Sequence, residues 1–227
     1  MEKKLGFGCM RLPLTDPENQ KSIDLAQFEK MVDTFLDRGF TYFDTAYMYH
    51  DYESETAVRK ALVERHPRES FTVTTKLPTM MLKKKEDVER IFNEQLRKLG
   101  VDYFDYYWLH NLNKNDIAQA DDFGCWEFIN RMKAEGKVKH IGFSFHDMPD
   151  MLDDLLTRHP EIEYVQIQLN YLDWEADNVK GRENYEVIVK HGKKCIVMEP
   201  VKGGTLANIP KEAEDVFRQI HPELSVP

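Results

Sequence analysis

Apolar positions along the chain follow two patterns that alternate from one end to the other. Residues 24–39 carry apolar side chains at the spacing of one helix face, at Phe28, Met31, Val32, Phe35 and Leu36. Asp24 and Gly39 stand at the two ends of this segment, as a helix N-cap and a helix-ending residue would. A short apolar and aromatic run, residues 40–46, comes next. The pair predicts a helix followed by a strand.

The same alternation continues over the rest of the chain. Further helix patterns occupy residues 54–66, with Ser54 as the expected N-cap, and residues 86–100, 125–136, 148–159 and 184–192. Strand-type runs occupy residues 5–10, 40–46, 70–78, 103–110, 139–145, 164–170 and 195–200. Alternating units of roughly thirty residues are typical of βα repeats with a parallel sheet. The sequence therefore predicts an α/β fold with about seven strands.

Two architectures fit this pattern, an open doubly wound sheet and a TIM-type (β/α)8 barrel. The dinucleotide fingerprint of the open sheet needs three spaced glycines before a helix. The segment GFGCMR, residues 6–11, has only two glycines, and no helix pattern follows it. No linker rich in proline or glycine divides the chain. We therefore expect one barrel domain over residues 1–227.

The composition limits the partners of the protein. The chain has 31 Lys and Arg against 40 Asp and Glu, a formal charge of −9, which argues against nucleic acid as a partner. No apolar run is long enough to cross a membrane and the N-terminal residues do not resemble a signal peptide, so we expect a cytoplasmic protein without membrane contact. Cys9, Cys125 and Cys195 are far apart and do not have the spacing of a metal site.

Polar or ionisable side chains stand where nearly every predicted strand ends. They are Asp44, Lys76, His110, Ser144, Gln166, Asn170 and Glu199, and Tyr49 lies five residues beyond Asp44. In a TIM-type barrel the carboxyl ends of the strands meet at one mouth, where the active sites of such enzymes lie. Each residue alone could be an ordinary surface, structural or capping side chain. Their coincidence at one mouth favours a catalytic site.

Six stretches in this order resemble the aldo-keto reductase family, namely LGFGCMRLP, FDTAYMY, TTKLP, WLH, GKVKHIGFSFHD and VQIQLNYL. The likeness covers nearly the whole chain and is strongest to a bacterial branch whose longer members carry a ferredoxin-like segment, although the cluster cysteines of that segment are absent here. The resemblance implies a TIM-type barrel. It also implies reduction of an aldehyde or ketone to an alcohol with NADPH, with NADH as the alternative cofactor.

The resemblance implies a catalytic tetrad of Asp44, Tyr49, Lys76 and His110. Tyr49 would give its proton to the carbonyl oxygen of the substrate. A free phenol has a pKa near ~10, and the ammonium of Lys76 would lower that pKa. Asp44 would hold Lys76 by an ion pair, and His110 would donate an N–H to the substrate oxygen.

The cofactor contacts implied by the resemblance come from both ends of the chain. They involve Gly8, Cys9, Met10, Asp44, Ser144, Gln166, Met198, Val201, Lys202 and Gly203. Ser144 and Gln166 would bind the nicotinamide carboxamide, but Phe145 stands where an asparagine is frequent in the family. Met198 would pack on the nicotinamide. The loop with Lys202 would bind the pyrophosphate through backbone N–H groups and the ammonium.

Two other functions stay open at the level of the sequence. A nucleotide-sensing regulatory protein could keep the fold and the tetrad without turnover. A metal-dependent hydrolase or isomerase could use Asp44, His110, His146 and Glu199 as ligands at the same mouth. The ammonium of Lys76 argues against the second function because it would repel a cation. We therefore expect no metal.

The number of strands sets a further expectation. A TIM barrel has eight strands and typically about 250 residues, whereas this chain of 227 residues supplies seven strand patterns. We expect a barrel truncated at its C-terminal end, without the final βα elements; the alternatives are association that supplies the missing edge and a shortened protein without activity. Two open strand edges would favour self-association. The carbonyl substrate itself is not predicted, because loops and the C-terminal elements set specificity in this fold.

Overall fold

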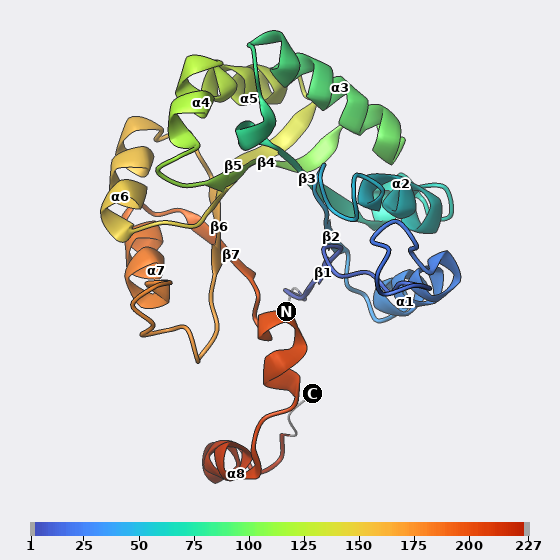
Figure 1. Ribbon diagram of the computed structural model, residues 1–227, viewed down its shortest axis with the longest axis vertical. Coiled ribbons are helices and arrows are strands. Elements are labelled where there is room, and N and C mark those ends of the chain that lie inside the picture. Colours follow the sequence, from blue (N-terminus) through green and yellow to red (C-terminus); the bar gives the residue numbers. More distant parts are fainter. Residues whose placement is uncertain (1–2, 225–227) are drawn as a thin grey trace.

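The computed structural model describes residues 3–224, so the first and last positions of the predicted domain 1–227 lie outside the described residues. Within this range seven parallel strands form one sheet in the order β1-β2-β3-β4-β5-β6-β7. The sheet curls into most of a ring, with helices on its outer side (Figure 1). The predicted TIM-type α/β architecture with about seven strands is confirmed.

Each strand pairs in parallel with the next strand along the chain, so the carboxyl ends of all of them lie at one rim. The strands are β1 Gly6–Gly8, β2 Tyr42–Asp44, β3 Thr72–Leu77, β4 Phe104–Leu112, β5 Val138–Phe145, β6 Tyr164–Gln168 and β7 Lys194–Met198. Every predicted strand is present. The prediction ended β4 at His110, whereas the strand continues to Leu112.

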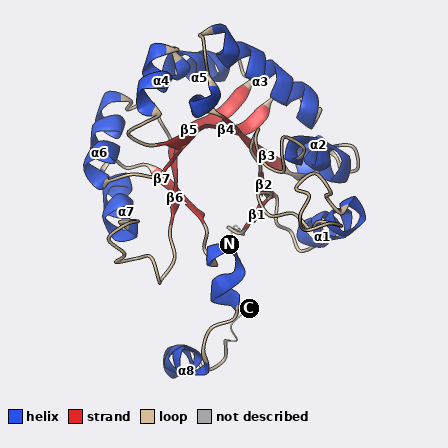
Figure 2. Cartoon of the chain, viewed as in Figure 1, coloured by secondary structure: helices blue, strands red, loops and turns tan. Residues whose placement is uncertain are grey.

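Helices connect the strands and cover the outer face of the sheet (Figure 2). The predicted ones are α1 Leu25–Asp37, α2 Ser54–Val58 with the π-helix Arg59–Val63, α3 Glu86–Leu99, α5 Cys125–Ala134, α6 Pro149–Arg158 and α7 Gly181–Lys190. The sequence did not predict α4 Ile117–Asp122, α8 Lys211–Ile220 or the 3-10 turns Arg68–Ser70, Thr79–Met81 and Lys202–Ala207. None of the described helices is long and apolar enough to cross a membrane.

Local signals fix the two ends of α1. The side chain of Asp24 accepts a hydrogen bond of 2.9 Å from the backbone N–H of Gln27, which satisfies a donor at the start of the helix. Gly39 follows the helix with φ of +78°, a conformation that a residue without Cβ adopts at little cost. The buried face of the helix consists of Phe28, Val32 and Phe35. This face packs into the core that supports β1 and β2.

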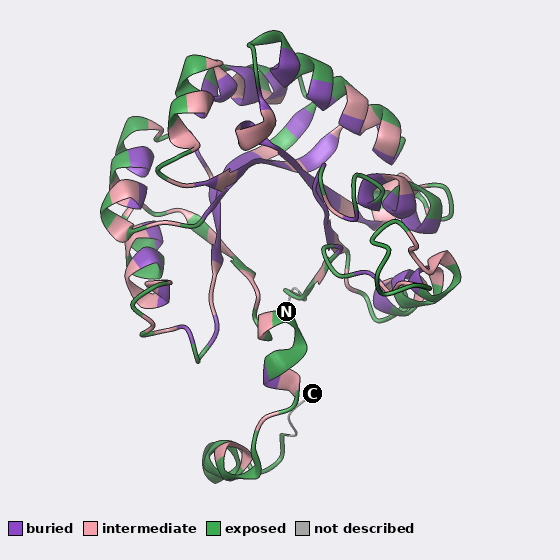
Figure 3. Cartoon of the chain, in the orientation of Figure 1, coloured by how far each residue is buried: buried purple, intermediate pink, exposed green. Residues whose placement is uncertain are grey.

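The core lies between the sheet and the surrounding helices, where the strands are buried and the outer helix faces are exposed (Figure 3). Phe43 of β2 and Phe143 of β5 are completely buried in this core, and burial of a large apolar side chain contributes about 1.5–3 kcal/mol. Several polar side chains interrupt the apolar pattern, and one of them, Lys76 of β3, is only 1% exposed. An ammonium at this depth needs hydrogen-bonding partners of opposite charge.

The ring is open between β7 and β1. In the described residues each of these strands pairs on one side only, and β7 is less buried than the inner strands. Helix α8 lies away from the ring (Figure 1), and none of its side chains is buried. Strands β2 to β6 therefore have a paired neighbour on both sides, whereas β1 and β7 form the two edges of the sheet.

Candidate active site

Four polar side chains meet at the rim formed by the carboxyl ends of β2, β3 and β4. Asp44 is the last residue of β2, and Lys76 is the next to last residue of β3. His110 belongs to β4, and Tyr49 lies in the loop that leaves β2. The parallel pairing of β2 with β3 and of β3 with β4 brings these positions together.

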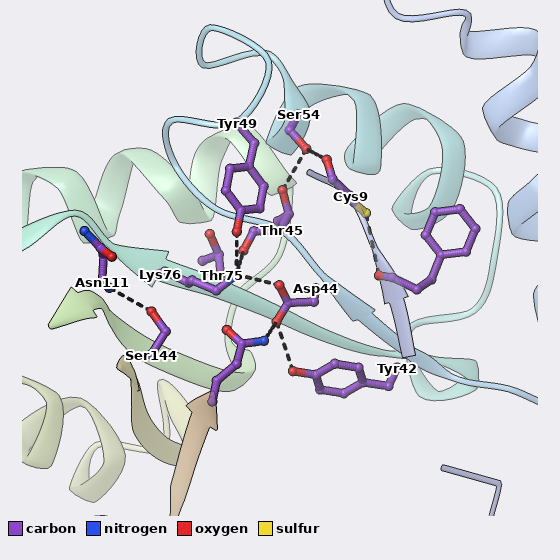
Figure 4. Close-up of polar contacts among 12 residues, drawn as sticks. Cys9, Tyr42, Asp44, Thr45, Tyr49, Ser54, Thr75, Lys76, Asn111 and Ser144 are labelled. Atoms are coloured by element: carbon purple, nitrogen blue, oxygen red, sulfur yellow. Dashed lines mark hydrogen bonds and ion pairs between the residues drawn. The ribbon is translucent and has the colours of Figure 1, made fainter. Parts of the chain in front are cut away.

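The ammonium of Lys76 is the centre of this group (Figure 4). Its Nζ donates to Oδ1 of Asp44 at 2.5 Å, to the backbone oxygen of Thr45 at 2.8 Å and to the hydroxyl of Tyr49 at 3.3 Å. Burial works to lower the pKa of Lys76, yet the pKa is raised overall because Asp44 and Tyr49 favour the charged form. Lys76 therefore carries a positive charge at neutral pH.

The carboxylate of Asp44 accepts hydrogen bonds on both of its oxygens. Oδ1 binds Lys76, while Oδ2 accepts from the hydroxyl of Tyr42 and from Nε2 of Gln166, each at 3.1 Å. The predicted ion pair between Asp44 and Lys76 is formed. Sequence reasoning missed Tyr42, although a residue two positions before Asp44 on a strand lies on the same face of the sheet. Gln166, predicted as a cofactor ligand, contacts Asp44 through its amide.

Burial and Lys76 act in opposite directions on Tyr49. Burial is the larger effect and raises the pKa of Tyr49 above its ordinary value, whereas the ammonium of Lys76 lowers it. Lys76 thus lowers the pKa of Tyr49, as predicted from the sequence. It does not bring the pKa below that of a free phenol, because desolvation of the phenol is the larger effect. Tyr49 is protonated at neutral pH and can act as a proton donor.

His110 lies against Tyr49 and is neutral. The two rings are 5.8 Å apart between centroids in an edge-to-face arrangement. Burial, together with the charge of Lys76, holds the pKa of His110 well below its usual range. Its Nδ1 is buried and has no hydrogen-bond partner among the described residues. A neutral imidazole keeps one N–H, so His110 can donate a hydrogen bond to a ligand bound at the rim.

A strained turn follows Tyr49. Residues 50–52 have φ values of +53°, +48° and +74°, and none of them is glycine, so each is costly in this left-handed conformation. The buried ring of His50 holds the turn, because its Nε2 accepts a hydrogen bond of 3.0 Å from the N–H of Leu12 and its Nδ1 lies 3.0 Å from the backbone oxygen of Gln20. No pattern in the sequence indicated this role of His50.

The predicted carboxamide-binding residues Ser144 and Gln166 are neighbours in the pairing of β5 with β6. The hydroxyl of Ser144 accepts a hydrogen bond of 2.7 Å from the backbone N–H of Asn111 and keeps its own O–H as a donor. Gln166 donates to Asp44 and keeps its side-chain oxygen as an acceptor. The pair therefore offers one donor and one acceptor, which matches the two polar groups of a carboxamide.

The other predicted cofactor residues lie at β1, at β7 and in the loops that follow these strands. Gly8, Met10, Val201 and Gly203 are exposed, and Met198 and Lys202 are half-buried. Cys9 differs from them because it is completely buried, and burial raises the pKa of its thiol. A cofactor could reach Cys9 only after a rearrangement of the β1 loop.

The loop expected to bind a pyrophosphate already has internal partners. The N–H of Lys202 donates to the oxygen of Glu199, and the N–H of Gly204 donates to the oxygen of Val201, each at 3.0 Å. The ammonium of Lys202 donates to Asp173 at 2.5 Å. A phosphate at this loop would therefore compete with Asp173 for Lys202.

The alternative metal site is not assembled. Among residues 3–224 no group of three or more His, Cys, Asp or Glu side chains is arranged to hold a metal ion. Asp44 is paired with Lys76, and Glu199 is paired with Arg11 at 2.8 Å. The arrangement does not support the hypothesis of a metal-dependent hydrolase or isomerase.

The four side chains can transfer a proton to an oxygen that gains negative charge. The phenol of Tyr49 is the donor, and the ammonium of Lys76 stabilises the phenolate that remains. The neutral ring of His110 lies beside the phenol and can donate a hydrogen bond to the same oxygen. This is the chemistry needed to complete the reduction of a carbonyl group.

The chain is similar to known oxidoreductases in sequence. The profile of the Aldo/keto reductase family matches residues 4–226. The protein named Probable aldo-keto reductase 1 from Glycine max is 30% identical over 185 residues, which cover 77% of this chain and 49% of that protein. A glycerol 2-dehydrogenase (NADP(+)) from Saccharomyces cerevisiae is 30% identical over 150 residues, which cover 54% of this chain and 46% of that protein.

The fold is similar to that of solved family structures. An aldo-keto reductase from Bacillus halodurans, solved in its holo form, has a TM-score of 0.70 and 27% sequence identity, and the match covers 91% of this chain and 65% of that chain. This chain spans about half the length of the curated relatives it matches.

Proposed function

Because the chain belongs to the aldo/keto reductase family, we propose that it reduces an aldehyde or ketone to an alcohol with NAD(P)H, with Tyr49 as the general acid. The contact of 3.3 Å between Nζ of Lys76 and the hydroxyl of Tyr49 carries the proposal, together with the ion pair between Lys76 and Asp44. A phenol beside a buried, paired ammonium is a proton donor whose conjugate base is stabilised in place.

Each member of the tetrad has a separate role in the proposed reaction. Tyr49 gives its proton to the carbonyl oxygen, and Lys76 stabilises the phenolate. Asp44 keeps Lys76 charged and fixed in position. His110, neutral because burial lowers its pKa, donates an N–H to the same oxygen and orients the carbonyl group.

NADPH is the proposed cofactor, with NADH as the alternative, and it would supply a hydride when bound. Ser144 and Gln166 fit its carboxamide, because one keeps a donor and the other keeps an acceptor. Further contacts are proposed for Gly8, Cys9, Met10, Asp44, Met198, Val201, Lys202 and Gly203. The name of the glycerol 2-dehydrogenase (NADP(+)) from S. cerevisiae supports this choice of cofactor.

The proposal treats residues 1–227 as one barrel domain that acts on a small carbonyl compound. The alternative is a nucleotide-sensing protein that uses the same rim to bind the cofactor without turnover. Cofactor binding is common to both functions, so turnover has to separate them.

Titration of the purified chain with NADPH and then with NADH, followed by quenching of intrinsic fluorescence, tests the first half of the proposal. Tyr49→Phe is carried in parallel, and we expect both proteins to bind. Only the wild type should then oxidise NADPH in the presence of simple aldehydes, with a loss of about 10²–10⁴-fold in the variant. Binding without turnover would favour the sensing protein. Lack of binding by the folded chain would contradict the proposal.

A further inference from the structure

Tyr42 touches the proposed catalytic group without belonging to the predicted tetrad. We propose that Tyr42 is a positioning residue for the reaction, whose hydroxyl occupies one oxygen of Asp44 so that the other oxygen is held toward Lys76. The inference rests on the proposed function and deepens it, because Tyr42 acts through Asp44 and Lys76 on the proton donor Tyr49.

The hydrogen bonds on Asp44 divide between its two oxygens. The hydroxyl of Tyr42 and the amide of Gln166 both reach Oδ2 at 3.1 Å, while Lys76 reaches Oδ1 at 2.5 Å. The hydroxyl of Tyr42 and the ammonium of Lys76 point to different oxygens of Asp44 (Figure 4). A carboxylate that accepts hydrogen bonds on both oxygens cannot rotate freely about its Cβ–Cγ bond. The direction of the ion pair between Asp44 and Lys76 is therefore fixed.

The ring of Tyr42 is fixed by its surroundings. Gly6 of β1 is its partner in the strand pairing, and a Cβ at Gly6 would come within 2.6 Å of Cδ1 of Tyr42. The ring of Tyr106 packs edge-to-face against it from another strand, with 5.3 Å between the centroids. The ring thus fills space that exists because residue 6 has no side chain.

The charges of Asp44 and Lys76 both act on Tyr49, and the hydroxyl of Tyr42 acts on the charge of Asp44. The negative charge of Asp44 raises the pKa of Tyr49, and the positive charge of Lys76 lowers it. Cys9 and His110 face the same pair, but their neutral forms prevail because burial raises the pKa of Cys9 and lowers that of His110.

The hydroxyl dipole of Tyr42 offsets part of the charge of Asp44. Burial raises the pKa of Tyr42 well above its usual value, so its hydroxyl stays protonated and remains a donor. Without this hydroxyl the charge of Asp44 would be less compensated, and Lys76 would be drawn toward Asp44 and away from Tyr49. Both changes raise the pKa of Tyr49 and make it a weaker acid.

Tyr42→Phe removes the hydroxyl, and Gly6→Ala displaces the ring by a separate route. Tyr164→Phe is the matched control. The ring of Tyr164 also packs against Tyr106, with 5.4 Å between the centroids, but its hydroxyl accepts a hydrogen bond of 3.1 Å from Lys194 and does not contact Asp44 in the described residues. The titration of Tyr49 is followed by NMR of chains labelled with 13C at Cζ of tyrosine, with Tyr49→Phe to assign the signal.

We expect the midpoint of the Tyr49 titration to rise by about 0.5 pH unit in Tyr42→Phe and in Gly6→Ala and to stay in place in Tyr164→Phe. The kcat for carbonyl reduction should fall about tenfold in Tyr42→Phe, with the KM for NADPH unchanged. An unchanged midpoint in Tyr42→Phe, or an equal rise in Tyr164→Phe, would overturn the inference. The titration needs no turnover, so a wild type without reductase activity would reject the proposed function and leave this test intact.

Discussion

At the scale of single residues, the ion pair between Lys76 and Asp44 is the strongest constraint on the site, because both groups are buried. Removal of one partner leaves the other charge without compensation, so we expect Lys76→Met to lower the free energy of unfolding by about 3–5 kcal/mol. The double variant Asp44→Asn/Lys76→Met should recover most of this loss. Urea unfolding measures both. Equal stabilities of the single and double variants would contradict this expectation.

The lowered pKa of His110 leads us to expect that the stability of the chain depends on pH. Its pKa in the folded chain lies well below the ordinary value of 6.5, so the unfolded chain binds a proton there while the folded chain does not. The contribution of His110 to stability is therefore complete above pH 6.5 and is lost as the pH falls below it, by up to about 1.4 kcal/mol per pH unit.

Urea unfolding at neutral and mildly acidic pH checks the effect of His110. We expect His110→Gln to lose less stability than the wild type over this interval, because the variant has no group to titrate at this position. His146 and His159 also have lowered pKa values, and both proteins contain them, so only the difference between the two losses is assigned to His110 and to its interaction with His146. Parallel losses in the two proteins would contradict the prediction.

The sequence predicted which residues share the rim, because strand ends and the parallel order of βα units follow from periodicity alone. It could not predict how the hydrogen bonds are distributed. Gln166 and Asp44 are separated by 122 positions, and their contact depends on the curl of the sheet and on two side-chain conformations. The catalytic and cofactor roles of the rim residues stay predictions.

At the scale of elements, the left-handed turn at residues 50–52 stores strain beside Tyr49. Asp51 is exposed and has φ of +48°, and a residue with a Cβ adopts this conformation at a cost of about 1–2 kcal/mol. Asp51→Gly removes that cost but adds backbone entropy to the unfolded chain, so we expect a net gain of up to about 1 kcal/mol in stability. Thermal or urea unfolding measures the change.

Asp51→Ala is the control for this prediction because it removes the carboxylate and keeps the Cβ. It should give no comparable gain. A gain of equal size in both variants would assign the effect to the charge of Asp51 instead of the backbone. The same comparison shows whether the turn beside Tyr49 is strained.

The elements themselves were largely predictable from the sequence, and the exceptions have physical reasons. Ser54 was expected to cap its helix. Its hydroxyl instead lies 2.8 Å from that of Thr45 and donates to the backbone oxygen of Cys9 at 3.2 Å. These tertiary contacts take the place of the predicted N-cap hydrogen bond. Helix α8 was not predicted, although the spacing of Val216, Phe217 and Ile220 fits a helix face. Helix α4 has only six residues, too few for a periodic signal.

At the scale of the whole molecule, the open side of the ring is the feature with the clearest consequence. In residues 3–224, β1 and β7 each pair on one side only, and unpaired strand edges are templates for association with another chain. Val197, the next to last residue of β7, is 43% exposed. This strand therefore exposes one apolar side chain beside its unpaired backbone, and we expect the chain to self-associate through it as its concentration rises.

Sedimentation at low and high protein concentration tests this association. We expect Val197→Lys to shift the chain toward the monomer, because a charge on an edge strand opposes pairing. Val189→Lys is the matched control, since Val189 is 56% exposed but lies on α7 instead of a strand edge. If Val216→Lys on α8, where the side chain is 55% exposed, dissociates the complex while Val197→Lys leaves it intact, the apolar face of α8 is the interface and the edge prediction is wrong. A wild type that stays monomeric at every concentration would contradict it as well.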